Sequence, residues 1–290
     1  MLSILIPTYN FNAFPLVNEI YNQCNTIKIN YEIIVIDDCS TEEKIENIKI
    51  NSLKNSSYII LKQNIGRSAI RNLLSKTARF NTLLFIDSGT FPESKNFIEN
   101  YILNSNNNVV VGGMTNLKTP PKKPYKLRWL YTKKRERVNN NTQRKVICSS
   151  NFLINKQIII NHPFDETIKT YGCEDVVFFE NLLKEKIKIN YIENPVTHDA
   201  LDDSNTFINK SEQAIENLIA LLNSNKINAK QYNVSLIYNK LEKYNLTGFV
   251  AFIFKKTKPL LKLNFRSSYP SIYLYDFYRL GYFCNLKQNN

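Results

Sequence analysis

The first 115 residues alternate between short apolar runs and stretches whose apolar residues are spaced three or four apart. Continuous apolar runs predict buried strands, and the wider spacing predicts helices. Strands are expected at 2–7, 32–37, 58–61, 82–87 and 109–113, and helices at 14–24, 67–78 and 97–103. This alternation is typical of an α/β fold with a mostly parallel sheet and helices on both faces.

The pattern changes after residue 117. Residues 118–145 are rich in Pro, charge and Asn, which predicts a long loop. Regular elements are then expected at 146–154 (strand), 174–186 (helix), 187–193 (strand) and 205–225 (amphipathic helix). The remaining segment, 226–290, is basic and aromatic, and we expect it to form a helical C-terminal extension.

The net charge of +13 comes from two segments. Residues 118–145 contain 11 Lys or Arg and one acid, and residues 255–290 contain seven Lys or Arg and one acid. Concentrated positive charge attracts an anionic partner such as nucleic acid, anionic lipid or a phosphorylated substrate.

The chain shows no apolar run near the roughly 20 residues that span a bilayer. Its first residues lack the basic start of a signal peptide. The five cysteines include no CxxC pair, which favours a reduced protein. We therefore expect a cytoplasmic protein, with peripheral attachment to the inner face of the cytoplasmic membrane as an extension of that expectation.

Polar side chains follow three of the predicted strands. Pro7, Thr8 and Tyr9 end the first, Asp38 follows the second, and Asp87 ends the fourth. Doubly wound sheets bind ligands at the carboxyl ends of their strands. Any one of these strand ends alone is typical of a helix cap or a turn. Polar residues at all three strand ends together favour a ligand-binding site. Neither GxGxxG nor GxxxxGK[ST] occurs, which disfavours a dinucleotide site or a P-loop.

These segments carry a family resemblance. SILIPTYN, EIIVIDDCST, QNIGRSAIRNLLSKTA and LLFIDSG, in this order, resemble the nucleotide-sugar half of a family 2 glycosyltransferase with the GT-A fold. LRWLYTKKRE, FLI, YGCEDVVFFENLLK and NPVTHD resemble the acceptor half of bacterial members that build surface polysaccharides. The resemblance implies a GT-A domain over 1–225, with a nucleotide-sugar half at 1–115 and an acceptor half at 116–225, followed by the extension.

The resemblance also implies roles for single residues. Pro7, Thr8 and Tyr9 would line the base and ribose of a nucleoside diphosphate, usually UDP, and Asp38 would accept a hydrogen bond from the base. The other residues expected at the nucleotide-sugar are Gly66, Arg71, Asp87 and Ser88.

The same resemblance implies that Glu174 and Asp175 are the catalytic acidic pair, in which Asp175 would be the base, and that His198 belongs to the metal site. The acceptor hydroxyl must lose a proton as it attacks, and a base facing away from the leaving group gives inversion. His198 would join Asp87 in holding Mn²⁺ or Mg²⁺, which stabilises the departing diphosphate.

The sequence departs from the family at Gly89, where an Asp-x-Asp pattern is usual and Asp-Ser-Gly stands here. We favour a weaker metal site of Asp87 and His198, completed by diphosphate oxygens and water. Basic side chains from 118–145 could instead neutralise the diphosphate. A third alternative is a non-catalytic GT-A-like protein that binds a nucleotide-sugar or a partner.

The aromatic and basic residues of 226–290 leave three interpretations open. They suit an anionic membrane surface, a helical cap packed on the domain, or RNA. Nucleic acid is disfavoured because it leaves the strand-end carboxylates unused. A lipid-diphosphate-linked acceptor would explain both basic segments. The sequence thus predicts an inverting glycosyltransferase that moves a sugar from a nucleotide-sugar to a glycan or lipid-linked glycan in surface polysaccharide synthesis.

Overall fold

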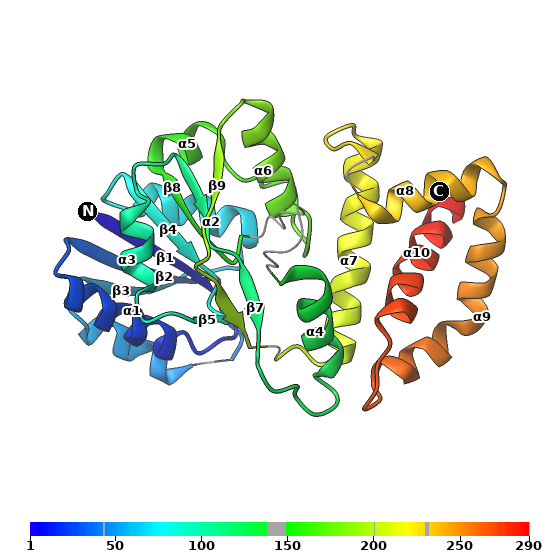
Figure 1. The fold of residues 1–290 in the computed structure, drawn as a ribbon, viewed down its shortest axis with the longest axis horizontal. Coiled ribbons are helices and arrows are strands. Elements are labelled where there is room, and N and C mark those ends of the chain that lie inside the picture. Colours follow the sequence, from blue (N-terminus) through cyan, green and yellow to red (C-terminus); the bar gives the residue numbers. More distant parts are fainter. Residues whose placement is uncertain (43, 138–148, 200, 230–231, 290) are drawn as a thin grey trace. The chain divides into compact units, whose positions relative to one another are not determined.

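The computed structural model describes residues 1–42, 44–137, 149–199, 201–229 and 232–289 (Figure 1). The chain forms two compact units. The first unit contains residues 1–116, 136–169 and 174–199, and the second contains residues 117–135, 170–173 and 200–290. These units are defined by how the chain packs, so they do not test the family domain expected over residues 1–225. That domain boundary stays a prediction.

The first unit is built on a seven-stranded sheet. Its strands, in spatial order, are β3 (Ser56–Ile60), β2 (Tyr31–Asp37), β1 (Leu2–Thr8), β4 (Thr82–Ile86), β8 (Asn151–Asn155), β6 (Val109–Val111) and β9 (Ile189–Tyr191). All neighbours run parallel except β8, which is antiparallel to both β4 and β6. The expected α/β architecture with a mostly parallel sheet is confirmed.

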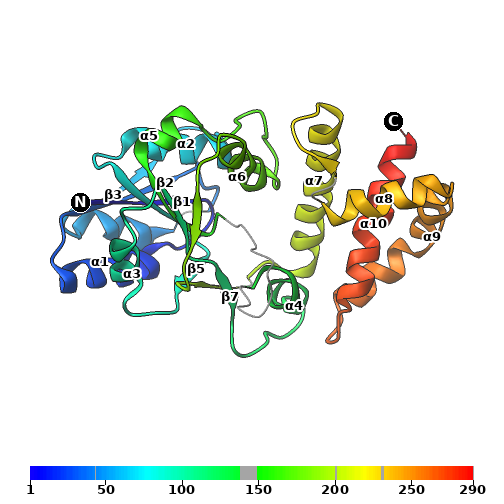
Figure 2. The same ribbon diagram turned by 45° about the horizontal axis from the view of Figure 1, so that its top comes forward.

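Helices cover both faces of this sheet (Figures 1 and 2). One face carries α1 (Phe14–Ile27), α3 (Phe97–Leu103) and the 3₁₀ segment η1 (Ile45–Ser52), and the other carries α2 (Arg67–Thr77), α5 (Lys156–Asn161) and α6 (Glu174–Lys184). Strand β1 shows why its sequence is continuously apolar. Ile4 and Ile6 pack into the core under α1, while Leu5 packs into the core under α2, because successive side chains point to opposite faces.

A second, three-stranded sheet was not expected from the sequence. It consists of β5 (Thr90–Pro92), β10 (Val196–His198) and β7 (Met114–Asn116), with β10 in the middle. Strands of three residues are too short to show a periodic pattern. Strand β10 runs antiparallel to β5, so it brings His198 opposite Thr90, just beyond the end of β4.

The second unit is helical. Its elements are α4 (Lys126–Tyr131), all but the last residue of the π-helical segment η2 (Thr132–Glu136), α7 (Ser204–Asn223), α8 (Asn233–Lys243), α9 (Thr247–Phe265) and α10 (Ile272–Asn289). The expected helical extension is therefore present. None of the helices within the described chain is long and apolar enough to cross a bilayer.

The expected loop over 118–145 is wrong for residues 126–136, which are helical. Leu127 and Trp129 are buried, and Leu127 belongs to the core of the second unit. Burial of these side chains stabilises the helix. The sequence does not predict it, because the surrounding Lys, Arg and Pro residues are typical of a loop. Residues 138–145, and the start of the strand expected at 146–154, lie outside the described residues.

Candidate functional site

The carboxyl ends of β1, β2 and β4 meet at one edge of the large sheet, because these strands are parallel neighbours. The backbone N–H of Asp38 donates to the carbonyl of Thr8 over 2.9 Å. Asp87 follows β4 directly, and its N–H donates to the carbonyl of Ser150. The fold therefore places the predicted residues of all three strand ends along one edge.

Asp38 holds the loop that precedes α2. Its two carboxylate oxygens accept hydrogen bonds from the backbone N–H groups of Ile65 (2.7 Å) and Gly66 (2.9 Å). Gly66 has a φ of +87°, which glycine adopts without strain, and it is the residue before the first turn of α2. Two predicted site residues, Asp38 and Gly66, are thus in direct contact.

A network of four charged side chains connects the end of β4 to the start of α6. Arg71 Nη2 lies 2.6 Å from Asp87 Oδ1, and Arg67 Nη2 lies 3.9 Å from Asp87 Oδ2. The other side of Arg67 reaches Glu174, with Nε 2.6 Å from Oε1. This charge network, formed by Arg67, Arg71, Asp87 and Glu174, joins residues expected at the donor to the expected catalytic pair.

The spacing along α2 explains the charge network. Arg67 and Arg71 are four residues apart, so they lie on the same face of the helix. Arg71 is only 1% exposed, and its Nη1 donates to the carbonyl of Arg67 over 3.1 Å. Its guanidinium also lies 5.6 Å from the ring centre of Phe164. A buried arginine needs an anionic partner, and Asp87, which is partly exposed, supplies it.

The pKa values of the two acids at the start of α6 shift in opposite directions. Burial raises the pKa of the Glu174 carboxyl, but the charges of Arg67 and Arg71 outweigh burial and hold that pKa below its ordinary value. Burial, together with the neighbouring Glu174 charge, raises the pKa of Asp175 to about 6. A carboxylate with this pKa is ionised at neutral pH and accepts a proton more readily than an ordinary aspartate.

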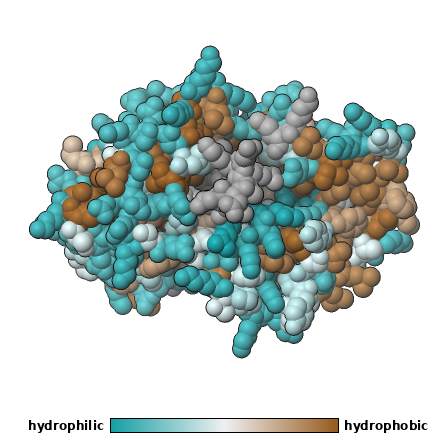
Figure 3. Space-filling view, viewed as in Figure 1, coloured by the Kyte–Doolittle hydropathy of each residue, from teal (hydrophilic) through white to brown (hydrophobic). Residues whose placement is uncertain are grey.

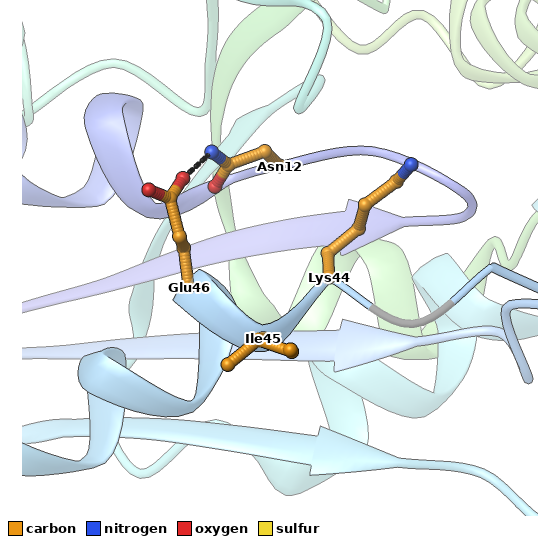
Figure 4. A pocket seen from close by; sticks show the side chains of 4 residues that line it. All are labelled: Asn12, Lys44, Ile45 and Glu46. Atoms are coloured by element: carbon orange, nitrogen blue, oxygen red, sulfur yellow. Dashed lines mark hydrogen bonds between the residues drawn. The ribbon is translucent and has the colours of Figure 1, made fainter.

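The loops after β1 and β2 are tied together. Asn10 Nδ2 donates to Thr41 Oγ1 over 3.0 Å, and Asn12 donates to Glu46. Figure 4 shows the surface hollow beside this second contact, lined by Asn12, Lys44, Ile45 and Glu46. None of these four residues was expected at the site.

The remaining residues predicted for the nucleotide differ in exposure. Tyr9 is 47% exposed, whereas Thr8 is buried. Pro7 and Ser88 are partly exposed. Tyr9 therefore presents a ring to solvent at the sheet edge, where a base could stack.

His198 and Asp199 lie beside the turn that contains Gly89. The N–H of Asp199 donates to the Gly89 carbonyl over 3.3 Å, and Asp199 Oδ1 lies 3.6 Å from His198 Nδ1. A Cβ added to Gly89 would lie 3.5 Å from Asp199 Oδ2. A carboxylate from β10's end thus borders the position where the family usually has its second acid.

The described residues show no complete set of protein ligands for a metal ion. Among the described residues, no three Asp, Glu, His or Cys side chains lie close enough together to hold an ion. Carboxylate and imidazole groups suit Mn²⁺ or Mg²⁺, and such ions are often held by one or two protein ligands plus substrate phosphates. The carboxylate of Asp87 and the imidazole of His198 are donor groups of the kind that would suit an ion shared with a bound diphosphate.

Sequence reasoning missed Arg67 and Asp199. Arg67 could have been found from its spacing of four residues to Arg71 at the start of a predicted helix. Asp199 follows His198 directly, but its position beside Gly89 depends on the pairing of β10 with β5, which the sequence does not reveal.

Comparison with known proteins agrees with the fold. Residues 3–162, more than half of the chain, match the family described as glycosyl transferase family 2. Poly(ribitol-phosphate) beta-N-acetylglucosaminyltransferase TarS of Staphylococcus aureus is 29% identical over 100 residues, which cover 31% of this chain and 16% of TarS. An uncharacterized glycosyltransferase of Haemophilus influenzae is 33% identical over 92 residues, covering 30% of this chain and 29% of that protein.

Among solved structures, GalNAc-T7 with UDP, GalNAc and Mn²⁺ superimposes with a TM-score of 0.51 at 15% identity, covering 73% of this chain and 48% of that one. A likeness at this identity shows the fold alone. The expected GT-A fold is confirmed, while the sequence relatives are matched over less than a third of their own length.

Proposed function

Because the chain belongs to glycosyl transferase family 2, we propose that it transfers a sugar, with inversion, from a nucleoside diphosphate sugar to a glycan or lipid-linked glycan. The observation that carries this proposal is the charge network. Through Arg67, it holds the start of α6 against the strand end that carries Asp87. A donor bound at the sheet edge would therefore have the acidic pair of α6 beside it.

We assign donor binding to the edge formed by Pro7, Thr8, Tyr9, Asp38 and Gly66, with Asp87 and Ser88 next to them. Tyr9 offers an exposed ring for the base. Asp38 and Gly66 shape the loop before α2, and Arg71 fixes Asp87 in place. Arg67, which is partly exposed, is the cation of the charge network that could reach a diphosphate.

Asp175 is the base in this proposal. Its pKa, raised to about 6 by burial and by Glu174, suits a group that must be ionised at neutral pH and still take a proton. Glu174, whose pKa is held low by the two arginines, keeps its charge and fixes Arg67. The attacking hydroxyl of the acceptor would give its proton to Asp175 as the bond to the anomeric carbon forms.

Asp87 and His198 would hold a divalent ion only together with the oxygens of the donor. When bound there, Mn²⁺ or Mg²⁺ would supply positive charge to the departing diphosphate. The metal-independent alternative assigns that task to basic side chains, of which Lys133, Lys134, Arg135 and Arg137 are described residues.

A polyanionic acceptor fits the charge of this chain. The Staphylococcus aureus relative is named for poly(ribitol-phosphate), a phosphate-linked polymer. Residues 118–137 of this chain contain nine Lys or Arg and one acid, so an acceptor rich in phosphate, either a polymer or a lipid diphosphate, would be attracted to them.

The test is release of the nucleoside diphosphate from a panel of donor sugars, beginning with UDP-N-acetylglucosamine, with and without Mn²⁺. Asp175→Asn should lower turnover by about 10²–10⁴-fold because it removes a positioned base. Donor binding, followed by calorimetry, should be retained. Turnover near that of the native protein would exclude Asp175 as the base.

A non-catalytic, nucleotide-sugar-binding protein is the second candidate, favoured by Gly89 and by the lack of a three-ligand cluster in the described chain. It predicts binding of a donor by the native protein with no release of nucleoside diphosphate under any metal condition. Detectable turnover excludes it.

A further inference from the structure

Helix α9 is apolar on two opposite faces. Its inner face, with Ala251, Phe254, Leu261 and Phe265, is buried in the core of the second unit. Its opposite face carries Phe249, Phe252, Leu260 and Leu263, which are 62%, 58%, 67% and 62% exposed. We call these four residues the outer stripe. Exposed apolar side chains that gather on one face of a helix often mark a surface that binds a partner, so the outer stripe is a candidate for such a surface.

The outer stripe is one continuous face. Its members, with Lys256 between them, follow one another at intervals of three or four residues, the spacing of a single helical face. Apolar surface is visible over the region of α9 in the space-filling view (Figure 3). Within the second unit, α9 packs against α10 through contacts such as Phe254 with Tyr278, ring centres 5.1 Å apart, and these use the inner face.

The charge of α9 identifies the partner. The helix contains four lysines and no acidic residue. Lys258 pairs with Glu212. Lys255 is exposed, and Lys256, which lies on the same face as the outer stripe, is exposed with its ammonium 5.8 Å from the ring centre of Phe252. In a symmetric contact with a second copy, the same face would meet itself, and these lysines would repel one another. An anionic bilayer surface complements both the charge and the apolar side chains.

We propose that the outer stripe inserts into the headgroup region of an anionic membrane, with Lys255 and Lys256 on the lipid phosphates. This attachment is separate from the proposed transfer reaction and needs no catalysis. The aromatic residues of 226–290 thus divide into two groups: Tyr275 and Tyr278 of α10 are buried in the helical core, and Phe249 and Phe252 face outward.

Deleting residues 245–290 would be an ambiguous test. Tyr278 and Tyr282 of α10 donate hydrogen bonds to Glu212 and Glu216 of α7, each over 2.5 Å. Removal of α10 would uncover the buried face of α7. Point substitutions on the outer stripe leave α7 covered, because the exposed side chains of the stripe are not part of the hydrophobic core.

The experiment is flotation of the full chain with vesicles of phosphatidylcholine, alone or mixed with phosphatidylglycerol. The native protein should bind the anionic vesicles, less so in high salt. Leu260→Ser/Leu263→Ser should weaken binding by at least about tenfold through lost apolar burial. Lys255→Gln/Lys256→Gln should weaken it by about 25-fold, since each lysine near such a surface contributes about fivefold.

The matched control is Leu103→Ser/Leu183→Ser, which removes two leucines of comparable exposure, 75% and 50%, from the first unit. It should leave vesicle binding unchanged. Three results would overturn the proposal: no binding by the native protein, equal loss in the control, or a dimer that the outer-stripe variant dissociates while neither protein binds vesicles. Sedimentation velocity detects the last of these.

Discussion

The edge of the seven-stranded sheet buries charged side chains, whereas the outer stripe of α9 exposes apolar ones. Both arrangements cost stability when each region is considered alone. At the sheet edge the cost is offset inside the chain, because Arg71 has Asp87 and Arg67 has Glu174. On α9 the outer stripe stays exposed among the described residues of the second unit. Buried charges that are paired within the chain indicate a site that must be held rigid. Exposed apolar side chains that nothing in the chain covers indicate a surface that binds a partner.

The largest expected effect on stability comes from breaking the compensation at the sheet edge. Arg71→Met leaves Asp87 with only the longer contact to Arg67. We expect the free energy of unfolding to fall by about 3 kcal/mol, the lower end for a broken buried ion pair, because Asp87 is partly exposed. Urea denaturation at neutral pH measures it.

Two other variants serve as controls for the stability loss expected of Arg71→Met. Arg79→Met removes an exposed arginine that stacks on Phe80, and Leu260→Ser/Leu263→Ser removes part of the outer stripe. Each should change stability by less than about 1 kcal/mol. If the outer-stripe variant lost as much stability as Arg71→Met, the outer stripe would be part of the folded core and the contrast between the two regions would disappear.

Much of this architecture could be predicted from the sequence. The expected strand at 82–87 appears as β4, and the expected helix at 97–103 appears with the same bounds. Long apolar runs and helical spacing are local features of the sequence, so they predict strands and helices without knowledge of distant contacts. Asp87 was visible in the sequence as a polar residue at a strand end, whereas Glu174 and Asp175 were singled out only by the family resemblance.

The contacts between distant segments were not predictable. Arg67 and Glu174 are 107 positions apart in the sequence, and only the packed structure brings them together as an ion pair. Asp199 reaches Gly89 through three-residue strands that leave no pattern. Helix α4 was missed because its buried Leu127 and Trp129 stand among lysines and arginines. In each case the structure depends on contacts between segments that are far apart in the sequence, and such contacts outweigh local sequence preferences.

A smaller effect is expected from Asp175, and it should depend on pH. Its pKa of about 6 in the folded chain exceeds the ordinary 3.8, so ionising it opposes folding. The native protein should therefore lose stability relative to Asp175→Asn as the pH rises from about 4 to about 6. Above that range the variant should be more stable by about 1–3 kcal/mol. Thermal unfolding across this pH range measures the difference.

The control for this comparison is Glu99→Gln on the exposed side of α3. It should alter stability by less than about 0.5 kcal/mol at every pH. A stability difference between native protein and Asp175→Asn that stayed constant from pH 4 to pH 8 would show that Asp175 is not held in a costly ionised state.

The smallest effect is expected at Gly89, where the chain departs from its family. Gly89 does not occupy the left-handed region, so a side chain brings no backbone strain. In Gly89→Asp the new carboxylate would lie next to Asp199, because the added Cβ already comes within 3.5 Å of Asp199 Oδ2. Repulsion between two such charges near a surface should cost about 1 kcal/mol in EDTA.

A divalent ion shared with a diphosphate should reverse that cost. Gly89→Asp would offer Mn²⁺ one more anionic oxygen group than the native protein does, so the variant should gain more thermal stability from Mn²⁺ added together with UDP. Gly89→Asn, which has the same shape without the charge, should show neither the loss in EDTA nor the gain. Calorimetry of Mn²⁺ binding in the presence of UDP gives a second readout that is independent of turnover. Equal responses of the Asp and Asn variants would mean that this edge of the sheet holds no ion, and leaving-group stabilisation would then fall to cations such as Arg67.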